Sequence, residues 1–330
     1  MIVYRFMTQL YNRKRFRMTQ YFRYILRRVA LMAVTLFIII SVTFLLVQFL
    51  PGSPFANEEL LTETQLALLY EKYGLNEPIH IQYFNYIRNV LKGDFGVSFQ
   101  FNNIPVTQIL ADRAGPSIQL GLQAMVLGTT VGTILGIIAA VKQNTWIDTL
   151  TSTVAIGGRS VPNFVFAVLL QFIFAVVLEW LPIAFWRDGF LSSILPTIAL
   201  AISPTAEAAR FIRTEMIEVL NSDYIELAKA KGFSRIYIIS KHALRNAIIP
   251  LLTILGPVTA SLMTGSLVIE NIFSIPGIGE QFTKSILVND YPTIMGVTIM
   301  YSVILVVIIL IVDILYGLID PKMRVTQGGK

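Results

Sequence analysis

The residues from Tyr224 to Pro250 gather charged and titratable side chains in an otherwise apolar neighbourhood. They read YIELAKAKGFSRIYIISKHALRNAIIP, and Glu226 and Lys229 lie three residues apart, a spacing that makes them neighbours on one helix surface. Gly232 follows, where a helix can end in a left-handed turn. This pattern predicts a short helix, a sharp turn at Gly232 and a second helix that returns into the membrane.

Catalytic motifs are missing from the sequence. It contains no G-x-x-x-x-G-K-[ST] phosphate loop, no H-E-x-x-H and no G-x-S-x-G, which are the patterns that carry nucleotide, zinc and serine chemistry. The histidines are His80 and His242, and there is no cysteine. We therefore predict no enzymatic activity and no catalytic, cofactor-binding or metal-binding residues. Any ATP that drives this protein would be bound by other subunits.

Glu207 and Asp313 lie within apolar runs. Ionisable groups at mid-membrane mark the proton and ion pathways of secondary transporters, so an ion-coupled carrier is an alternative function, and a membrane-embedded enzyme or scaffold is another. A pair between Glu207 and Arg210, and a bond from Asp313 to a neighbouring helix, are the simpler interpretations.

The elements that must position these residues are membrane helices. Hydrophobic residues make up 55% of the 330 residues and charged residues 14%, against about 25% charged in soluble domains. About 20 apolar residues span a bilayer as a helix. We predict an all-α polytopic membrane protein, and its six transmembrane helices are expected at 29–50, 117–141, 155–179, 194–213, 248–269 and 296–318.

The distribution of basic residues predicts the orientation. Residues 1–28 hold eight Lys or Arg and no acidic residue, whereas 51–116 hold four basic and seven acidic residues. We expect a basic cytoplasmic N-terminal tail (1–28), an external insertion (51–116) and a five-helix core (117–319) carrying a cytoplasmic elbow at 221–247. A cytoplasmic tail follows at 320–330. The net charge of +6 is a topology signal and gives no reason to expect nucleic acid.

The insertion is expected to hold two amphipathic helices. The first would run from Glu58 to Lys72, capped by Asn57 and ended near Gly74, and the second would start after Pro78 and end near Gly93. Two interpretations remain open for this segment. It is either a folded connector or an external cap that receives a ligand or a docking partner.

Two further segments combine small residues with apolar ones. Gly128, Gly132, Gly136 and Ala140 are spaced by four residues, which predicts a helix face for close packing. In NIFSIPGIGEQF, residues 271–282, a tight turn is predicted at Pro276, Gly277 and Gly279. That turn is either a packed corner or a candidate external gate.

For the elbow itself, Asp223 is expected to cap the first helix, with Glu226 in capping-box spacing. Tyr224, Leu227, Ala228 and Lys231 would share one face, and Ser234 would cap a second helix that continues past Pro250 into the membrane. Three interpretations compete on these residues alone: a helix on lipid headgroups, a gate for the protein's own pore, or a projection that enters a pocket of a cytoplasmic partner.

The stretch ELAKAKG resembles the EAA motif of ABC importer permeases, which reads Glu-Ala-Ala, three residues, Gly. It matches at Glu226, Ala228 and Gly232, with Leu227 in place of the central alanine. The general motif continues with Ile-x-Leu-Pro, of which only Leu244 is present, and the proline comes later at Pro250. That departure is similar to the oligopeptide and dipeptide branch. Four other stretches also resemble this branch: YILRRV (24–29), LPGSP (50–54), GDFGVSF (93–99) and FSIPGIGE (273–280).

The resemblance covers nearly the whole chain from about Met18, which could be the true start. It implies the ABC importer permease fold and transport of oligopeptides or dipeptides, or of nickel in the same branch. Expected partners are a second homologous permease, two cytoplasmic ATPase subunits, an external substrate-binding protein and the lipid of a prokaryotic plasma membrane. Glu226, Ala228, Lys229 and Gly232 would carry the ATPase coupling.

Overall fold

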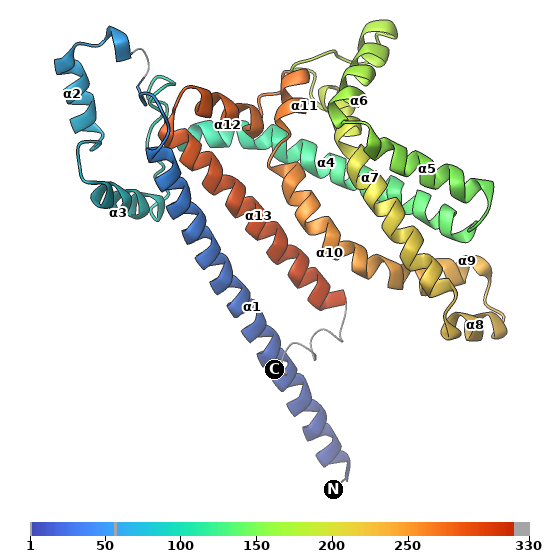
Figure 1. The fold of residues 1–330 in the computed structure, drawn as a ribbon. Coiled ribbons are helices and arrows are strands. Elements are labelled where there is room, and N and C mark those ends of the chain that lie inside the picture. Colours follow the sequence, from blue (N-terminus) through green and yellow to red (C-terminus); the bar gives the residue numbers. More distant parts are fainter. Residues whose placement is uncertain (1, 56–57, 320–330) are drawn as a thin grey trace.

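The computed structural model describes residues 2–55 and 58–319, and this part of the chain is helical with one isolated bridge, between Val97 and Pro105. Figure 1 shows the elbow on the same side of the bundle as the N-terminal end of α1, with α11 and α12 on the opposite side. The α-helices are α1 (Ile2–Gln48), α2 (Glu63–Lys72), α3 (Ile79–Val90), α4 (Val106–Val141), α5 (Trp146–Ser160), α6 (Asn163–Leu170), α7 (Phe190–Leu220), α8 (Asp223–Ala230), α9 (Arg235–Tyr237), α10 (Leu244–Met263), α11 (Leu267–Ile272), α12 (Ile278–Leu287) and α13 (Tyr291–Ile319).

Five of the predicted transmembrane helices have counterparts that are long and apolar enough to cross a bilayer. They are Ile25–Gln48, Val106–Val141, Phe190–Leu220, Thr253–Ile272 and Tyr291–Leu315. The all-helical membrane fold inferred from the apolar runs is therefore confirmed. The predicted tail 1–28 is not separate from the first span, because α1 runs without a break from residue 2. The predicted C-terminal tail, 320–330, lies outside the described residues.

The third predicted helix, 155–179, is the exception. Val161 has extended backbone angles before Pro162, which ends α5 and starts α6, because a residue before proline is pushed out of the helical region. The apolar helix that follows covers only Asn163–Val177, and its last part, Gln171–Val177, is π-helical. This segment is shorter than the span that hydropathy alone predicted.

Within the predicted insertion, 51–116, α4 already begins at Val106, and it carries Pro116 inside it. The first helix of the insertion starts later than predicted, at Glu63, where Thr62 and Gln65 form a capping box; the predicted cap, Asn57, lies outside the described residues. The positive φ angles of Gly74 and Gly93 agree with the predicted ends of the two helices. Buried Asp290 anchors the segment before α4, accepting hydrogen bonds from the Ser98 hydroxyl (2.6 Å) and the Phe99 amide (3.1 Å).

The predicted small-residue face of α4 packs against α7. A Cβ atom added at Gly128 would lie 2.7 Å from the Ala201 carbonyl oxygen, and one at Gly136 would lie 2.6 Å from the Ala209 carbonyl oxygen. Such distances leave no room for a side chain, so the two backbones meet directly. Lipid tails are as apolar as the helices, and close packing of this kind is what holds membrane helices together.

We expect Gly136→Val to destabilise the bundle, because the added atoms meet a backbone oxygen that cannot rotate away. Overpacking of this kind costs about 1–3 kcal/mol. Gly157→Val is the control, since Gly157 lies inside the helix α5 and an added Cβ there meets nothing within 4 Å. Thermal unfolding in mild detergent checks both variants, and equal stability of the two would contradict the packing role.

Candidate functional site

The elbow is built from α8, a turn at Gly232 and a second helical segment that continues into α10. Arg235–Tyr237, the π-helical residues Ile238–Ala243 and α10 follow one another without a break. This continuity confirms the prediction that the second helix of the elbow runs past Pro250 into the membrane. A displacement of the elbow would therefore also move the adjoining first turns of α10.

The ends of the two elbow helices have defined geometry. Ser222, not Asp223, occupies the N-cap position of α8, and it forms no side-chain capping bond. At the other end Gly232 has φ 78°, its amide donates to the Lys229 carbonyl, and the Phe233 amide donates to the Ala228 carbonyl. That pair of bonds is the Schellman arrangement that ends helices at a left-handed glycine. Ser234 caps the second helix as predicted, accepting from the Tyr237 amide at 3.3 Å.

The buried face of α8 differs from the predicted one. Ile225 and Ala228 are buried and pack against Ile238, whereas Tyr224 and Leu227 are exposed. The small side chain of Ala228 therefore admits the second helix of the elbow itself, and it offers no open surface to another chain. Of the predicted coupling residues, Glu226, Lys229 and Gly232 are exposed.

The exposed surface of the elbow is also unusually apolar, a feature that the sequence analysis missed. Large apolar side chains project from both helices and from the turn between them, and Ile236 is 80% exposed. The exposed set is Tyr224, Leu227, Phe233, Ile236 and Tyr237. Their only signal in the sequence is that apolar residues recur within a charged segment. Exposed apolar area bordered by charge marks surfaces that meet another protein or a membrane.

Three contacts connect the elbow to the rest of the bundle. The guanidinium of Arg235 donates to the Val141 carbonyl at the end of α4 (3.3 Å), where a cation also suits the helix dipole. The Asn246 amide donates to the Tyr224 hydroxyl (2.7 Å). Ala243 belongs to a buried cluster formed with α4, α7 and α10. The elbow thus has a core that continues into the membrane helices.

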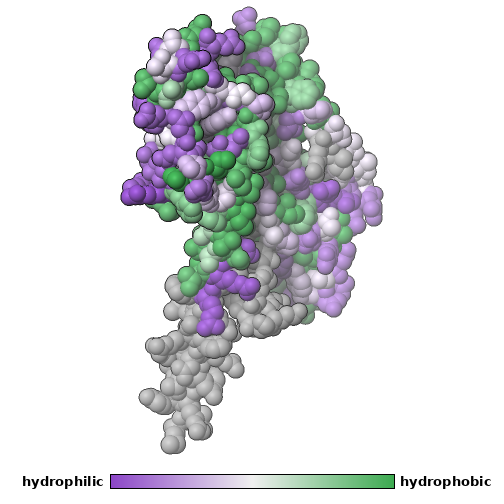
Figure 2. Space-filling model, turned by 60° about the vertical axis from the view of Figure 1, so that its left-hand side comes forward, coloured by the Kyte–Doolittle hydropathy of each residue, from purple (hydrophilic) through white to green (hydrophobic). Residues whose placement is uncertain are grey.

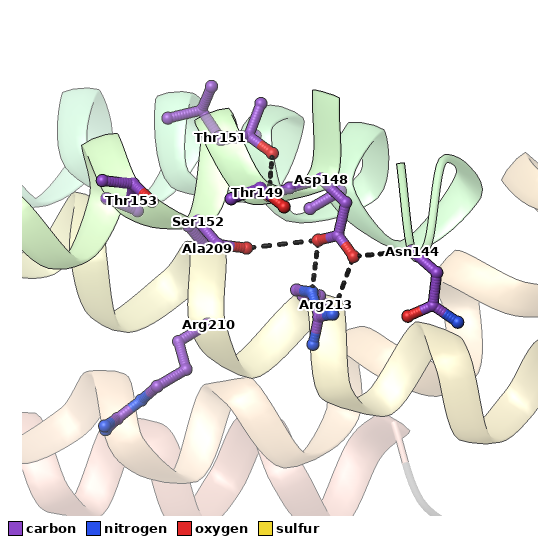
Figure 3. A pocket seen from close by; sticks show the side chains of 12 residues that line it. Asn144, Asp148, Thr149, Thr151, Ser152, Thr153, Ala209, Arg210 and Arg213 are labelled. Carbon is purple, nitrogen blue, oxygen red and sulfur yellow. Dashed lines mark hydrogen bonds and ion pairs between the residues drawn. The ribbon is translucent and has the colours of Figure 1, made fainter. Parts of the chain in front are cut away.

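Next to the elbow, an ion pair joins α5 to α7 (Figure 3). The Arg213 guanidinium donates to both carboxylate oxygens of Asp148, from Nε at 2.7 Å and from Nη2 at 2.8 Å. The Asn144 amide and the Ser152 hydroxyl donate to the same carboxylate, and Asp148 is buried. The hydrogen bonds from Arg213 lower the pKa of Asp148 to about 2, with smaller contributions from Asn144 and Ser152.

Asp148 and Arg213 line one end of a cavity of about 560 Å³ between α4, α5 and α7. Its other walls carry hydroxyl groups, and the Arg210 side chain extends away from Asp148 (Figure 3). The two bonds from Arg213 join the Asp148 carboxylate of α5 directly to α7. The pair therefore serves to fix α5 on α7.

The predicted turn at Pro276, Gly277 and Gly279 is a packed corner. Phe273, Ile275 and Ile278 are buried, as expected for a turn that folds back on the bundle. The two glycines surround the buried carboxylate of Glu270, and a Cβ at Gly279 would lie 3.0 Å from its Oε2. The role of this turn as an external gate stays a prediction.

Glu270 was not singled out by sequence reasoning. Its Oε1 accepts from the Ser117 hydroxyl (2.7 Å) and its Oε2 from the Glu280 amide (3.0 Å). The Ser117 oxygen in turn accepts from the Ile278 amide (2.9 Å). These bonds satisfy a buried carboxylate as burial demands. An acidic residue in the apolar run SLVIENIF was the available signal.

Comparison with known proteins identifies the family to which the chain belongs. Residues 132–325 match the family described as "Binding-protein-dependent transport system inner membrane component", and residues 21–120 match its N-terminal membrane component. The chain belongs to this family. It is 47% identical over 92% of its length to the dipeptide transport system permease protein DppB of Lactococcus lactis, covering 99% of that protein. It is 42% identical, at the same coverages, to the oligopeptide transport system permease protein OppB of Escherichia coli.

Two solved structures of ABC transporters have a fold similar to that of this chain. An inward-facing form of the MetNI methionine ABC transporter aligns with TM-score 0.54 at 17% identity, over 65% of this chain and 97% of that one. An amino acid ABC transporter aligns with TM-score 0.51 over 64% and 94%. The ABC importer permease fold implied by the motifs is therefore confirmed. The chain is a permease whose candidate spans would cross the membrane several times.

Two acidic residues, Glu207 and Asp313, were the sequence features that could indicate an ion-coupled carrier. Asp313 on α13 pairs with Arg28 on α1 at 3.1 Å, which confirms the predicted bond to a neighbouring helix. The predicted pairing of Glu207 with Arg210 stays a prediction. Together with family membership, the pair between Arg28 and Asp313 favours a structural role for Asp313.

We expect Asp148→Asn to destabilise the transport component by about 3 kcal/mol, near the lower end for breaking a buried pair, because the Arg213 side chain is 32% exposed. The pKa of Asp148 is lowered, so its contribution is complete above the ordinary value of 3.8 and is lost as pH falls through about 2.

The difference in thermal unfolding between wild type and Asp148→Asn should therefore stay constant from about pH 8 to about pH 5. Thr153→Ala, an exposed position of the same cavity, is the control and should match wild type. A stability difference that shrinks within this pH range would refute the proposed ion pair.

Proposed function

We propose that this chain is one of two homologous permease subunits of an ABC importer that carries dipeptides or oligopeptides across a prokaryotic plasma membrane. The supporting observation is that relatives matched over nearly their full length are named dipeptide and oligopeptide transport permeases. A channel shared with a second permease fits a chain whose helices leave large apolar surfaces exposed. Substrate selectivity would then lie mainly in an external substrate-binding protein.

The elbow would receive the driving force from two cytoplasmic ATPase subunits. No phosphate-binding loop occurs in the sequence, so nucleotide must be bound elsewhere. The exposed surface of the elbow could bind a protein partner in two ways. Its charged side chains, Glu226 and Lys229, would fix the orientation of the partner. Its apolar side chains, Leu227 and Ile236, would supply buried area and hence affinity. The contacts of Arg235 and Ala243 support transmission of force to α4 and α10.

The proposed orientation has the elbow and both termini in the cytoplasm. Lys and Arg in residues 1–28 and in the elbow support it by the positive-inside rule. The insertion and the packed turn around Glu270 would then face outward, towards the substrate-binding protein. Pro276, Gly277 and Gly279 are candidate gate residues because movement of α12 would have to break the hydrogen bond from the Glu280 amide to Glu270 and the one from the Ile278 amide to Ser117.

The transport proposal is tested by reconstituting the chain in proteoliposomes with its second permease, the ATPases and the binding protein. We expect ATP-dependent uptake of labelled dipeptides or longer oligopeptides, unaffected by ionophores that dissipate ion gradients. Uptake of Ni²⁺ instead of peptides would overturn the substrate assignment. Uptake by the chain alone, or uptake abolished by ionophores, would overturn the assignment to an ABC importer.

We expect Gly232→Val to uncouple transport from ATP hydrolysis, because the left-handed backbone costs a residue with a side chain about 1–2 kcal/mol and valine would reshape the turn. Space is not the constraint, since nothing lies within 4 Å of an added Cβ. Gly232→Asn is the matched control, as asparagine tolerates this conformation. Peptide uptake and ATPase activity are measured together. Normal uptake in the valine variant would show that the elbow is not the coupling element.

A further inference from the structure

Helix α3 lies against α1 at a level inside the membrane span. The Tyr83 hydroxyl and the Ser41 hydroxyl are hydrogen-bonded at 2.6 Å. The ring of Phe44 contacts Tyr83 edge-on and stacks on Tyr86, with centroids 5.4 and 6.0 Å away. At the end of α1 the Gln48 side-chain amide donates a hydrogen bond to the Gln82 side-chain oxygen (3.4 Å). Figure 1 shows α3 crossing beside the insertion end of α1 rather than standing above it.

The depth of these contacts follows from the geometry of α1. The candidate span runs from Ile25 to Gln48, and Ser41 lies seven residues before its end. At a rise of 1.5 Å per residue, Ser41 is about 10 Å inside the span. A helix that bonds to Ser41 and packs on Phe44 therefore lies about as deep as amphipathic helices that rest in the boundary between headgroups and acyl chains.

Exposed apolar side chains on and just after α3 are accompanied by exposed basic ones, Arg88 and Lys92, whose apolar stems let the charged ends reach lipid headgroups. Ile81, Phe84 and Leu91 fall at positions i, i+3 and i+10, and Phe84 is 68% and Leu91 83% exposed. The sequence of α3, IHIQYFNYIRNV, contains no acidic residue. Tyr83 and Tyr86 lie on its inner side, and tyrosine is enriched at membrane interfaces.

The exposed strip also continues the outer surface of α1. Leu46 and Phe49, near the insertion end of that helix, are 62% and 81% exposed. In Figure 2, where this side of the molecule comes forward, apolar surface runs along the upper part of α1 below the mixed polar surface of the insertion. A surface shared with a membrane-spanning helix, at the same depth, must meet the same surroundings.

We propose that α3 is an interfacial helix seated in the leaflet on the insertion side, with Ile81, Phe84 and Leu91 in contact with lipid. The bilayer is its occupant because the strip is continuous with α1 and lies within the span. This proposal depends on membrane crossing alone and not on the transported substrate.

The loop before α3 transmits this anchoring to α2. The Gln82 side-chain amide donates to the carbonyls of Leu75 and Glu77, and the Asn85 amide donates to the Glu77 carboxylate. The turn between the two insertion helices is therefore fixed by α3. Lipid would thus set the height at which α2 stands above the membrane.

The absence of cysteine from the sequence permits a direct test with single nitroxide labels. Phe84→Cys and Leu91→Cys are labelled in the full-length chain, in phospholipid nanodiscs, and their collisions with oxygen and with a water-soluble nickel chelate are measured. Leu68→Cys on α2, an equally apolar and exposed position, is the control. We expect the oxygen-to-nickel ratio to be several-fold higher at 84 and 91 than at 68.

Equal ratios at all three positions would mean that α3 stands in water, and the proposal would be wrong. Protection of positions 84 and 91 from both reagents would mean that a protein partner covers the strip, which also overturns it. Ile81→Cys provides a further position if either labelled variant fails to fold. Temperature-dependent unfolding of each labelled chain confirms that the bundle is intact.

Discussion

The direct contact between the backbones of α4 and α7 is the constraint on which the rest of the structure depends. Gly128 and Gly136 each face a carbonyl oxygen of α7 at a distance that excludes any side chain. Within a bilayer no hydrophobic force drives helices together, so this close fit must supply the attraction. The other elements are arranged around the pair, since α5 is fixed to α7 through Asp148 and the elbow is fixed to α4 through Arg235.

The elbow differs from a flexible cytoplasmic loop because it has a core. Ile225, Ala228 and Ile238 are buried against one another, and the cluster that contains Ala243 extends among α4, α7 and α10. Packed interfaces shift between discrete arrangements instead of deforming continuously. A force applied to the exposed surface of α8 would therefore displace whole helices, which is what coupling over the thickness of a membrane requires.

Buried carboxylates hold the fold at its ends. Asp148 is satisfied by Arg213, Glu270 by Ser117 and the amide of Glu280, and Asp290 by Ser98 and the amide of Phe99. Each joins segments that are distant in the sequence, and Glu270 and Asp290 lie at or beside the ends of candidate membrane spans. Such fully bonded groups specify one arrangement of helix ends, and they leave the middle of the bundle to close apolar packing.

Local signals in the sequence were enough to predict the membrane helices, the left-handed end of α8 at Gly232, the cap at Ser234 and the small-residue face of α4. These follow from composition and local backbone preference, which act over a few residues. Tertiary packing decided that Ala228 is buried and that Glu270 is enclosed by glycines. It also decided the depth of α3, because that depends on which residue of α1 Tyr83 meets. Contacts between residues far apart along the chain carry no periodic signal, so they emerge only when the helices are packed.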